Sequence, residues 1–209
     1  MESYKTIQAN GYFEEVIKKS RFIGQVFRIS SEEEGKAILA NIKKEHYKAN
    51  HSCSAMIIGE NAQIKRSSDD GEPSGTAGLP ILSILEKQGL TNILVVVTRY
   101  FGGIKLGTGG LIRAYSSVTA ATLDNSQQII VKEQVGLRVH LSYSQYQVFT
   151  NFIETYGLVE QHTTFTDQVS TTLFCDFDFQ SKLIQELSEF YQGKISFEAV
   201  DSQVVEIPI

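Results

Sequence analysis

Five glycines and three basic residues gather in the stretch RYFGGIKLGTGGLIR at residues 99–113. Glycine lets the backbone approach a ligand closely, and the N–H groups exposed at a helix start favour an anion. The spacing matches neither of the two common phosphate-loop fingerprints closely, so a purely structural tight turn is an equally good interpretation. If the stretch binds an anion, we expect the contacts to come from Arg99, Gly102, Gly103, Lys105, Gly107, Thr108, Gly109, Gly110 and Arg113.

Three acids mark a second unusual loop, DDGEPSGTAG at residues 69–78. Carboxylates of this kind can hold Mg²⁺, but Asp-Gly and Pro-Ser-Gly also form turns, and a hydroxyl side chain can cap the following helix. We therefore predict no metal here. If both loops meet at one end of a sheet, the acids can pair with the cations of the glycine-rich stretch and brace it. The predicted brace comprises Asp69, Asp70, Glu72, Ser74 and Thr76.

His51 and Cys53 are two residues apart in an apparent strand, so their side chains share one face. Structural zinc needs four ligands, and the other histidines and the second cysteine offer no pair at suitable spacing. A Cys–His nucleophilic pair would need an orienting group and a lowered thiol pKa. We favour packing inside the domain and predict no catalytic residue, metal or cofactor.

The elements that must position these loops are predicted from the apolar pattern. The unbroken run in NILVVVTRY at residues 92–100 predicts a central strand covered on both faces, and a helix follows from about Thr108 to Leu123. Ser31 and Glu34 predict a capping box at an earlier helix. Residues 51–60 and 62–68 read as a hairpin that leads into the acidic loop.

The last third of the chain follows the order βαββαβ, which is typical of a ferredoxin-like fold. Its first helix has Tyr146, Phe149 and Phe152 on one stripe, with Ser144 as the predicted N-cap and Gly157 as the predicted stop. The predicted fold class is α+β, with domains at residues 1–135 and 136–209.

Composition and charge limit the function classes. Of 209 residues, 42% are hydrophobic and 21% charged, which is typical of a folded chain. The N-terminus lacks a secretory pattern and the longest aliphatic run is too short for a bilayer, so we expect a cytoplasmic protein with no membrane partner. Residues 1–135 hold 16 basic and 14 acidic residues, whereas residues 136–209 hold 3 and 10. A polyanion should therefore meet the first domain.

Four stretches carry a resemblance to a known family: KSRFIG at 19–24, HSCSA at 51–55, DDGEPSGTAGLPIL at 69–82 and VTRYFGGIKLGTGGLIRAY at 97–115. The chain resembles the IMPACT family, in particular its bacterial YigZ/YvyE-type members. The resemblance implies an N-terminal domain similar to domain 2 of ribosomal protein S5. It also implies a C-terminal domain like domain V of elongation factor G, and eukaryotic relatives that regulate translation.

These observations favour a non-enzymatic, translation-associated regulator that binds RNA, the ribosome or a translation factor through the two loops of the first domain. Two alternatives stay open. One is an enzyme that acts on a phosphorylated small molecule or nucleotide at the same loops, and the other is a protein–protein adaptor that uses the acidic domain.

Overall fold

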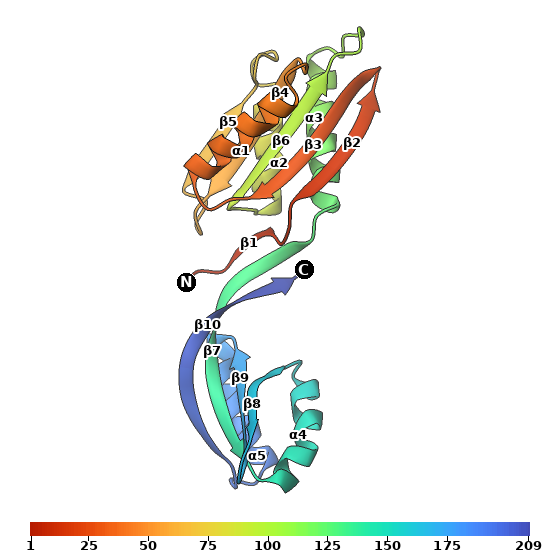
Figure 1. The fold of residues 1–209 in the computed structure, drawn as a ribbon. Coiled ribbons are helices and arrows are strands. Elements are labelled where there is room, and N and C mark those ends of the chain that lie inside the picture. Colours follow the sequence, from red (N-terminus) through yellow and green to blue (C-terminus); the bar gives the residue numbers. More distant parts are fainter. The chain divides into compact units, whose positions relative to one another are not determined.

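The computed structural model describes all 209 residues, which form two compact units (Figure 1). The N-terminal unit contains residues 2–131 and 206–209, and the C-terminal unit contains Met1 and residues 132–205. The division falls inside strand β7 (Gln128–Leu141), close to the predicted boundary at residue 135. A single boundary does not describe the chain fully, because its last residues return to the N-terminal unit.

The N-terminal unit is built on an antiparallel sheet of five strands with helices on both faces. The strand order in this sheet is β2-β3-β6-β4-β5. A further strand, β1, pairs with the first residues of β7. In chain order the elements are β1 (Tyr4–Ile7), β2 (Gly11–Ile17), β3 (Ser20–Arg28), α1 (Glu32–Glu45), β4 (His51–Ile58), β5 (Ile64–Ser68), α2 (Gly78–Gln88), β6 (Ile93–Tyr100) and α3 (Thr108–Asp124).

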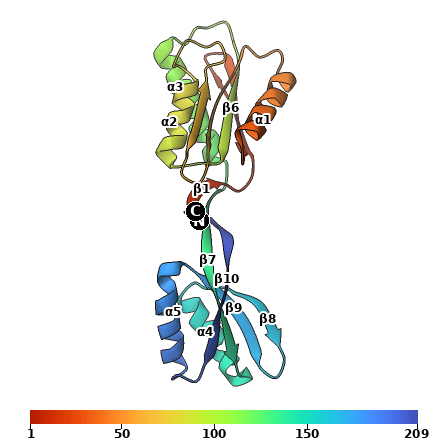
Figure 2. The same cartoon turned by 90° about the vertical axis from the view of Figure 1, so that its left-hand side faces the viewer.

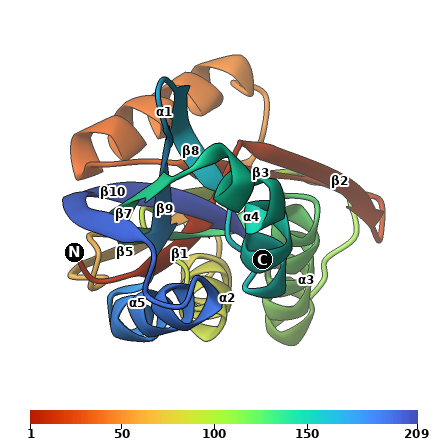
Figure 3. The ribbon, with the colours of Figure 1, turned by 90° about the horizontal axis from the view of Figure 1, so that it is seen from below.

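Strand β6 lies at the centre of this sheet, and its residues from Ile93 to Arg99 are buried. Helix α1 covers one face of the sheet, and α2 and α3 cover the other, as Figure 2 shows from the side and Figure 3 from below. Alternate residues of β6 enter two cores, Val95 with α2 and α3, and Val96 with α1. The prediction of a central strand covered on both faces is confirmed.

Local signals account for the helix starts that lead away from this sheet. Ser31 caps α1 by accepting the N–H of Glu34 at 3.1 Å, as predicted, but the Glu34 carboxylate binds Ser30 instead of closing the box on Ser31. Pro80 lies in the first turn of α2, where the missing N–H has no partner to lose.

The C-terminal unit has the predicted ferredoxin-like order. Its strands are arranged β10-β7-β9-β8, and both helices pack on one sheet face around Leu137, Phe149 and Leu187. The predicted cap at Ser144 is wrong: Ser142 accepts the N–H of Gln145, and the Gln145 side chain returns to the N–H of Ser142. The elements after β7 are α4 (Tyr143–Thr155), β8 (Glu160–Phe165), β9 (Val169–Cys175), α5 (Phe177–Phe190) and β10 (Ser196–Pro208).

Candidate anion-binding site

The acidic loop and the glycine-rich loop meet at one end of the N-terminal sheet. The first connects β5 to α2, and the second connects the central strand β6 to α3. Together they enclose a cavity of about 450 Å³, which we call the loop cavity. Its lining residues are Asn50, His51, Glu72, Pro73, Arg99, Phe101, Lys105, Leu106, Gly107, Thr108 and Leu111.

A buried ion pair joins the two loops. Arg99 donates from Nη1 to Glu72 Oε1 at 2.7 Å and from Nη2 to Ser20 Oγ at 3.2 Å. The Tyr115 hydroxyl donates to the same Glu72 oxygen at 2.8 Å. Arg99 and Glu72 are only 5% and 8% exposed, and the Arg99 guanidinium lies over the Phe101 ring at 5.5 Å.

This pairing gives Arg99 a structural role beside the expected contact with an anion. The guanidinium was expected to contact a phosphate, but its two outer nitrogens are already bound to Glu72 and Ser20. The buried cation and its carboxylate partner hold the two loops together, and Arg99 also lines the loop cavity with its Nε free of any hydrogen-bond partner. Of the three acids in the predicted brace, Glu72 alone pairs with a cation of the glycine-rich stretch.

Asp69 braces its own loop and not its neighbour. Its carboxylate accepts the N–H groups of Gly75, Ala77 and Gly78 at 2.8 to 3.0 Å. Burial alone would raise the pKa of Asp69, but these N–H groups outweigh it and hold the pKa below its ordinary value. The start of α2 is therefore capped by Asp69, from upstream of the cap position.

The other residues of the predicted brace act elsewhere. Asp70 accepts the N–H of Ser52 at 2.6 Å and pairs with Lys43 of α1 at 2.5 Å. Thr76 donates its hydroxyl to the Pro73 carbonyl at 2.6 Å, and Ser74 is exposed without a hydrogen bond. Neither hydroxyl caps α2, because its N-cap position is occupied by Ala77. No group of three or more potential ligands is placed to hold a metal ion.

The start of α3 is open to an anion. Gly107 is its N-cap at φ +73°, no side chain caps the helix and its first turn contains no acid. The N–H groups of Thr108, Gly109 and Gly110 have no partner within the helix, because the first helical bond runs from Leu111 to the Gly107 carbonyl. These donors and the positive end of the helix dipole favour a negative group at this place.

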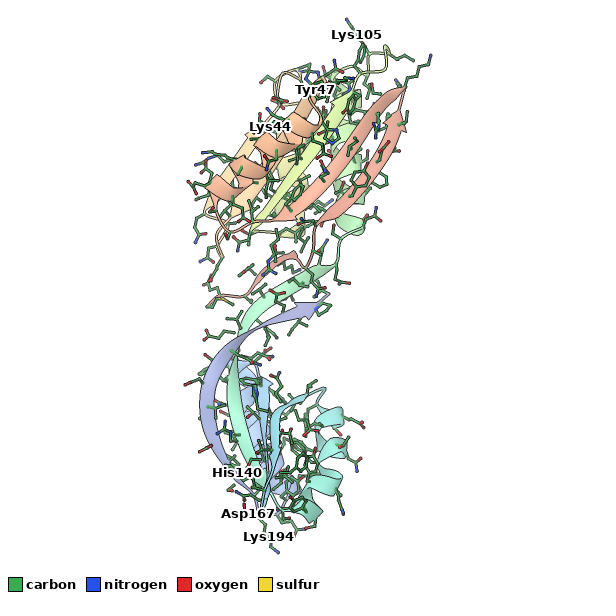
Figure 4. All side chains as sticks on the ribbon, in the orientation of Figure 1. Lys44, Tyr47, Lys105, His140, Asp167 and Lys194 are labelled. Carbon is green, nitrogen blue, oxygen red and sulfur yellow. The ribbon has the colours of Figure 1, made fainter.

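Two exposed cations flank the start of α3. Lys105 lies at the tip of the glycine-rich loop, as Figure 4 shows, and forms no ion pair. The Arg113 side chain reaches back over Gly109, also without a carboxylate partner. Gly103 supplies a positive φ of +85°, and Gly102 packs so closely that a Cβ would meet the Lys19 carbonyl oxygen at 1.9 Å.

The fold also brings residues to this end that the sequence did not assign to the site. The turn between β2 and β3 presents Lys18 and Lys19, both exposed and both at positive φ. Tyr47, after α1, is 73% exposed, and the Lys48 ammonium lies over its ring at 5.5 Å. The Lys18-Lys19 pair is visible in the sequence, but only the contact of their turn with Gly102 connects it to the glycine-rich loop.

His51 lines the loop cavity, whereas Cys53 is buried in the core. The His51 Nδ1 lies 2.9 Å from the Asp70 carbonyl, and its Nε2 lies in the loop cavity 3.8 Å from Glu72 Oε2. Cys53 is fully buried and donates its thiol to the Asp69 carbonyl. Burial raises the pKa of the Cys53 thiol to about 12, so the thiolate needed for nucleophilic chemistry does not form near neutral pH.

None of the five helices combines the length and the apolar character required to cross a bilayer.

Comparisons with known proteins agree with this division into two units. The model of the Impact N-terminal domain matches residues 18–123, and a domain of unknown function, DUF1949, matches residues 139–194. IMPACT family member YvyE of Bacillus subtilis (strain 168) is 52% identical over 125 residues, which are 60% of this chain and 58% of YvyE. IMPACT family member YigZ of Escherichia coli (strain K12) is 38% identical over 152 residues, which are 72% of this chain and 73% of YigZ.

A solved structure supports the same relationship. The crystal structure of a hypothetical protein aligns with 96% of this chain and 98% of its own, with 30% identity and a TM-score of 0.61. The Impact_N match extends over the acidic loop, the glycine-rich loop and most of α3. The chain therefore belongs to the IMPACT family.

Proposed function

We propose that the chain is a binding protein of the translation apparatus whose N-terminal unit binds single-stranded RNA at the sheet end that holds the loop cavity. The observation that carries the proposal is the open start of α3 beside the exposed, unpaired cations Lys105 and Arg113. Backbone N–H groups at a helix start and neighbouring lysine and arginine side chains are the usual ligands of a nucleic acid phosphate.

The distribution of ion pairs supports this location. Arg21, Lys43, Lys65 and Arg99 are each paired with a carboxylate of the N-terminal unit. The cations that remain unpaired at the end of the loop cavity are exposed, and they can attract a polyanion without first breaking an ion pair. They are Lys18, Lys19, Lys48, Lys105 and Arg113.

Exposed aromatic rings lie among these cations. Tyr47 is 73% exposed and Phe101 is 45% exposed, and Figure 4 shows Tyr47 and Lys105 toward the same end of the unit. Unstacked bases can stack on such rings, whereas the bases of a duplex are already stacked on each other. Single strands are therefore the form of nucleic acid that this surface fits best.

Family membership directs the proposal toward translation. The resemblance of the sequence to the IMPACT family implies relatives that regulate this process, and the Impact_N match includes both loops of the proposed site. The acidic character of the C-terminal unit supports contact of RNA with the N-terminal unit, because negative charge opposes phosphate binding.

Fluorescence anisotropy with a labelled single-stranded oligoribonucleotide tests the proposal. Titrations at several salt concentrations should give a linear fall of log K with log salt. The double variant Lys105→Ala with Arg113→Ala should bind more weakly and reduce the slope by about 1.4, since each lost contact with a single strand contributes about 0.7.

A matched control separates the site from the overall charge. Lys87 on α2 and Lys182 on α5 are also exposed and form no ion pair, and neither of them lines the loop cavity. Replacing both with alanine removes the same charge and should leave affinity and slope nearly unchanged. Equal effects of the two double variants, or no binding of RNA by the wild type, would overturn the proposal.

A further inference from the structure

The inner wall of the loop cavity presents two hydrogen-bond acceptors that no group of the protein satisfies. These are Glu72 Oε2 and His51 Nε2, which are 3.8 Å apart. This distance is too long for a direct hydrogen bond between them. Both atoms can therefore accept a hydrogen bond from a ligand that enters the cavity.

The tautomer of the His51 ring follows from the hydrogen bond made by its Nδ1. Nδ1 lies 2.9 Å from the Asp70 carbonyl oxygen, which can only accept a hydrogen bond. Nδ1 therefore carries a proton, and in the neutral ring Nε2 has a free lone pair. The acidic loop thus sets the tautomer of His51 that directs an acceptor into the cavity.

The two carboxylate oxygens of Glu72 differ in their hydrogen-bond partners. Its Oε1 accepts from Arg99 at 2.7 Å and from Tyr115 at 2.8 Å, whereas Oε2 accepts no hydrogen bond. The residue is only 8% exposed. The second carboxylate oxygen is therefore free to accept a hydrogen bond from a ligand in the cavity.

The geometry selects the ligand group. A hydroxyl about 2.8 Å from each acceptor fits between atoms that are 3.8 Å apart, and it can share its single hydrogen between them in a three-centre hydrogen bond. A phosphate is excluded there, since it would lie against the Glu72 carboxylate. The same cavity is also lined by the Lys105 cation and by Gly107 and Thr108 at the start of α3, where the helix favours an anion. The cavity therefore fits a hydroxyl close to an anionic group.

At the internal nucleotides of a strand, that combination occurs only in RNA, where the ribose 2′-hydroxyl neighbours the 3′-phosphate. We infer that Glu72 and His51 bind a ribose 2′-hydroxyl while the start of α3 holds an adjacent phosphate, so that the site selects RNA over DNA. The inference rests on the proposed function, and it assigns to His51 a role in specificity.

Three oligonucleotides of one sequence test the inference: RNA, DNA and 2′-O-methyl RNA. The 2′-O-methyl strand keeps the oxygen but cannot donate. The wild type should bind RNA about tenfold more tightly than either of the others, which corresponds to one hydrogen bond to a charged acceptor. His51→Phe, which keeps a ring of similar size, should lower this preference with little loss of DNA affinity.

The controls make the two proposals separable. Lys105→Ala with Arg113→Ala should weaken RNA and DNA alike and leave their ratio unchanged. Equal binding of RNA and DNA by the wild type, or an unchanged ratio in a folded His51→Phe protein, would overturn the inference and leave the proposed function intact. Absence of binding to every strand would overturn both.

Discussion

Removing one partner of the Glu72–Arg99 pair should destabilise the N-terminal unit strongly. At an effective dielectric constant of about 20, unit charges 2.7 Å apart attract each other by roughly 6 kcal/mol. Desolvation of each buried ion costs several kcal/mol, so the net contribution of the intact pair is small. An orphaned buried charge keeps its desolvation cost, which gives an expected loss of about 3–5 kcal/mol for Glu72→Gln or Arg99→Met.

The double variant separates pairing from the loss of either side chain. With both charges removed, neither buried ion is left without a partner, so the double variant should lose at least about 2 kcal/mol less than the sum of the single variants. Calorimetry of the full chain measures this, and a loss of 3 kcal/mol should lower the melting temperature of the N-terminal unit by about 10 °C.

A control assigns the thermal transitions. Leu187 is fully buried in the C-terminal core, so Leu187→Ala should shift the transition of the C-terminal unit alone. Single-variant losses below about 1 kcal/mol, or losses that simply add in the double variant, would refute the view that the ion pair holds the two loops together.

Three further predictions concern the loops and the buried thiol. Because the pKa of Asp69 is lowered in the folded protein, its carboxylate contributes its full stabilisation at pH values above the ordinary pKa of 3.8, and this stabilisation is lost as the pH falls through the lowered pKa. The difference in unfolding free energy between wild type and Asp69→Asn, measured in urea, should therefore be larger at pH 7 than at pH 3. Gly107→Ala should cost about 1–3 kcal/mol, because φ +73° with ψ 165° strains any residue but glycine. Gly102→Ala should cost more, because its Cβ would collide with the Lys19 carbonyl, and equal costs in urea would contradict this packing. The raised pKa of Cys53 predicts that Ellman's reagent labels it slowly at pH 8 in the native protein and rapidly in urea, and rapid native labelling of one thiol at this position would contradict its burial.

The sheet and helices could be predicted because their signals are local. The apolar run that forms β6 and the glycine-rich start of α3 are contiguous in the chain, and the structure places both elements within a residue or two of the predicted bounds. The cap of α4 was misplaced because Ser142 and Ser144 are both good cap residues. Only the reciprocal bonds with Gln145 decide between them.

The chemistry of the site could be predicted only in part, because its partners are set by tertiary contacts. Glu72 and Arg99 are 27 residues apart, and no pattern shows that a charged residue in each loop will be buried. Asp69 caps a helix from nine residues before Gly78, outside any capping motif. His51 Nε2 is an acceptor because Nδ1 is bound to the backbone carbonyl of Asp70, and a contact with a backbone carbonyl cannot be predicted from residue types.

The most direct measurement of the anion site is a ¹H–¹⁵N NMR titration of the full chain with a short single-stranded oligoribonucleotide. Binding at the start of α3 predicts that the amides of Lys105, Thr108, Gly109 and Gly110 shift first and furthest, and that added salt reverses the shifts. Shifts confined to residues 132–205, or saturable binding that leaves these four amides unmoved, would contradict the account.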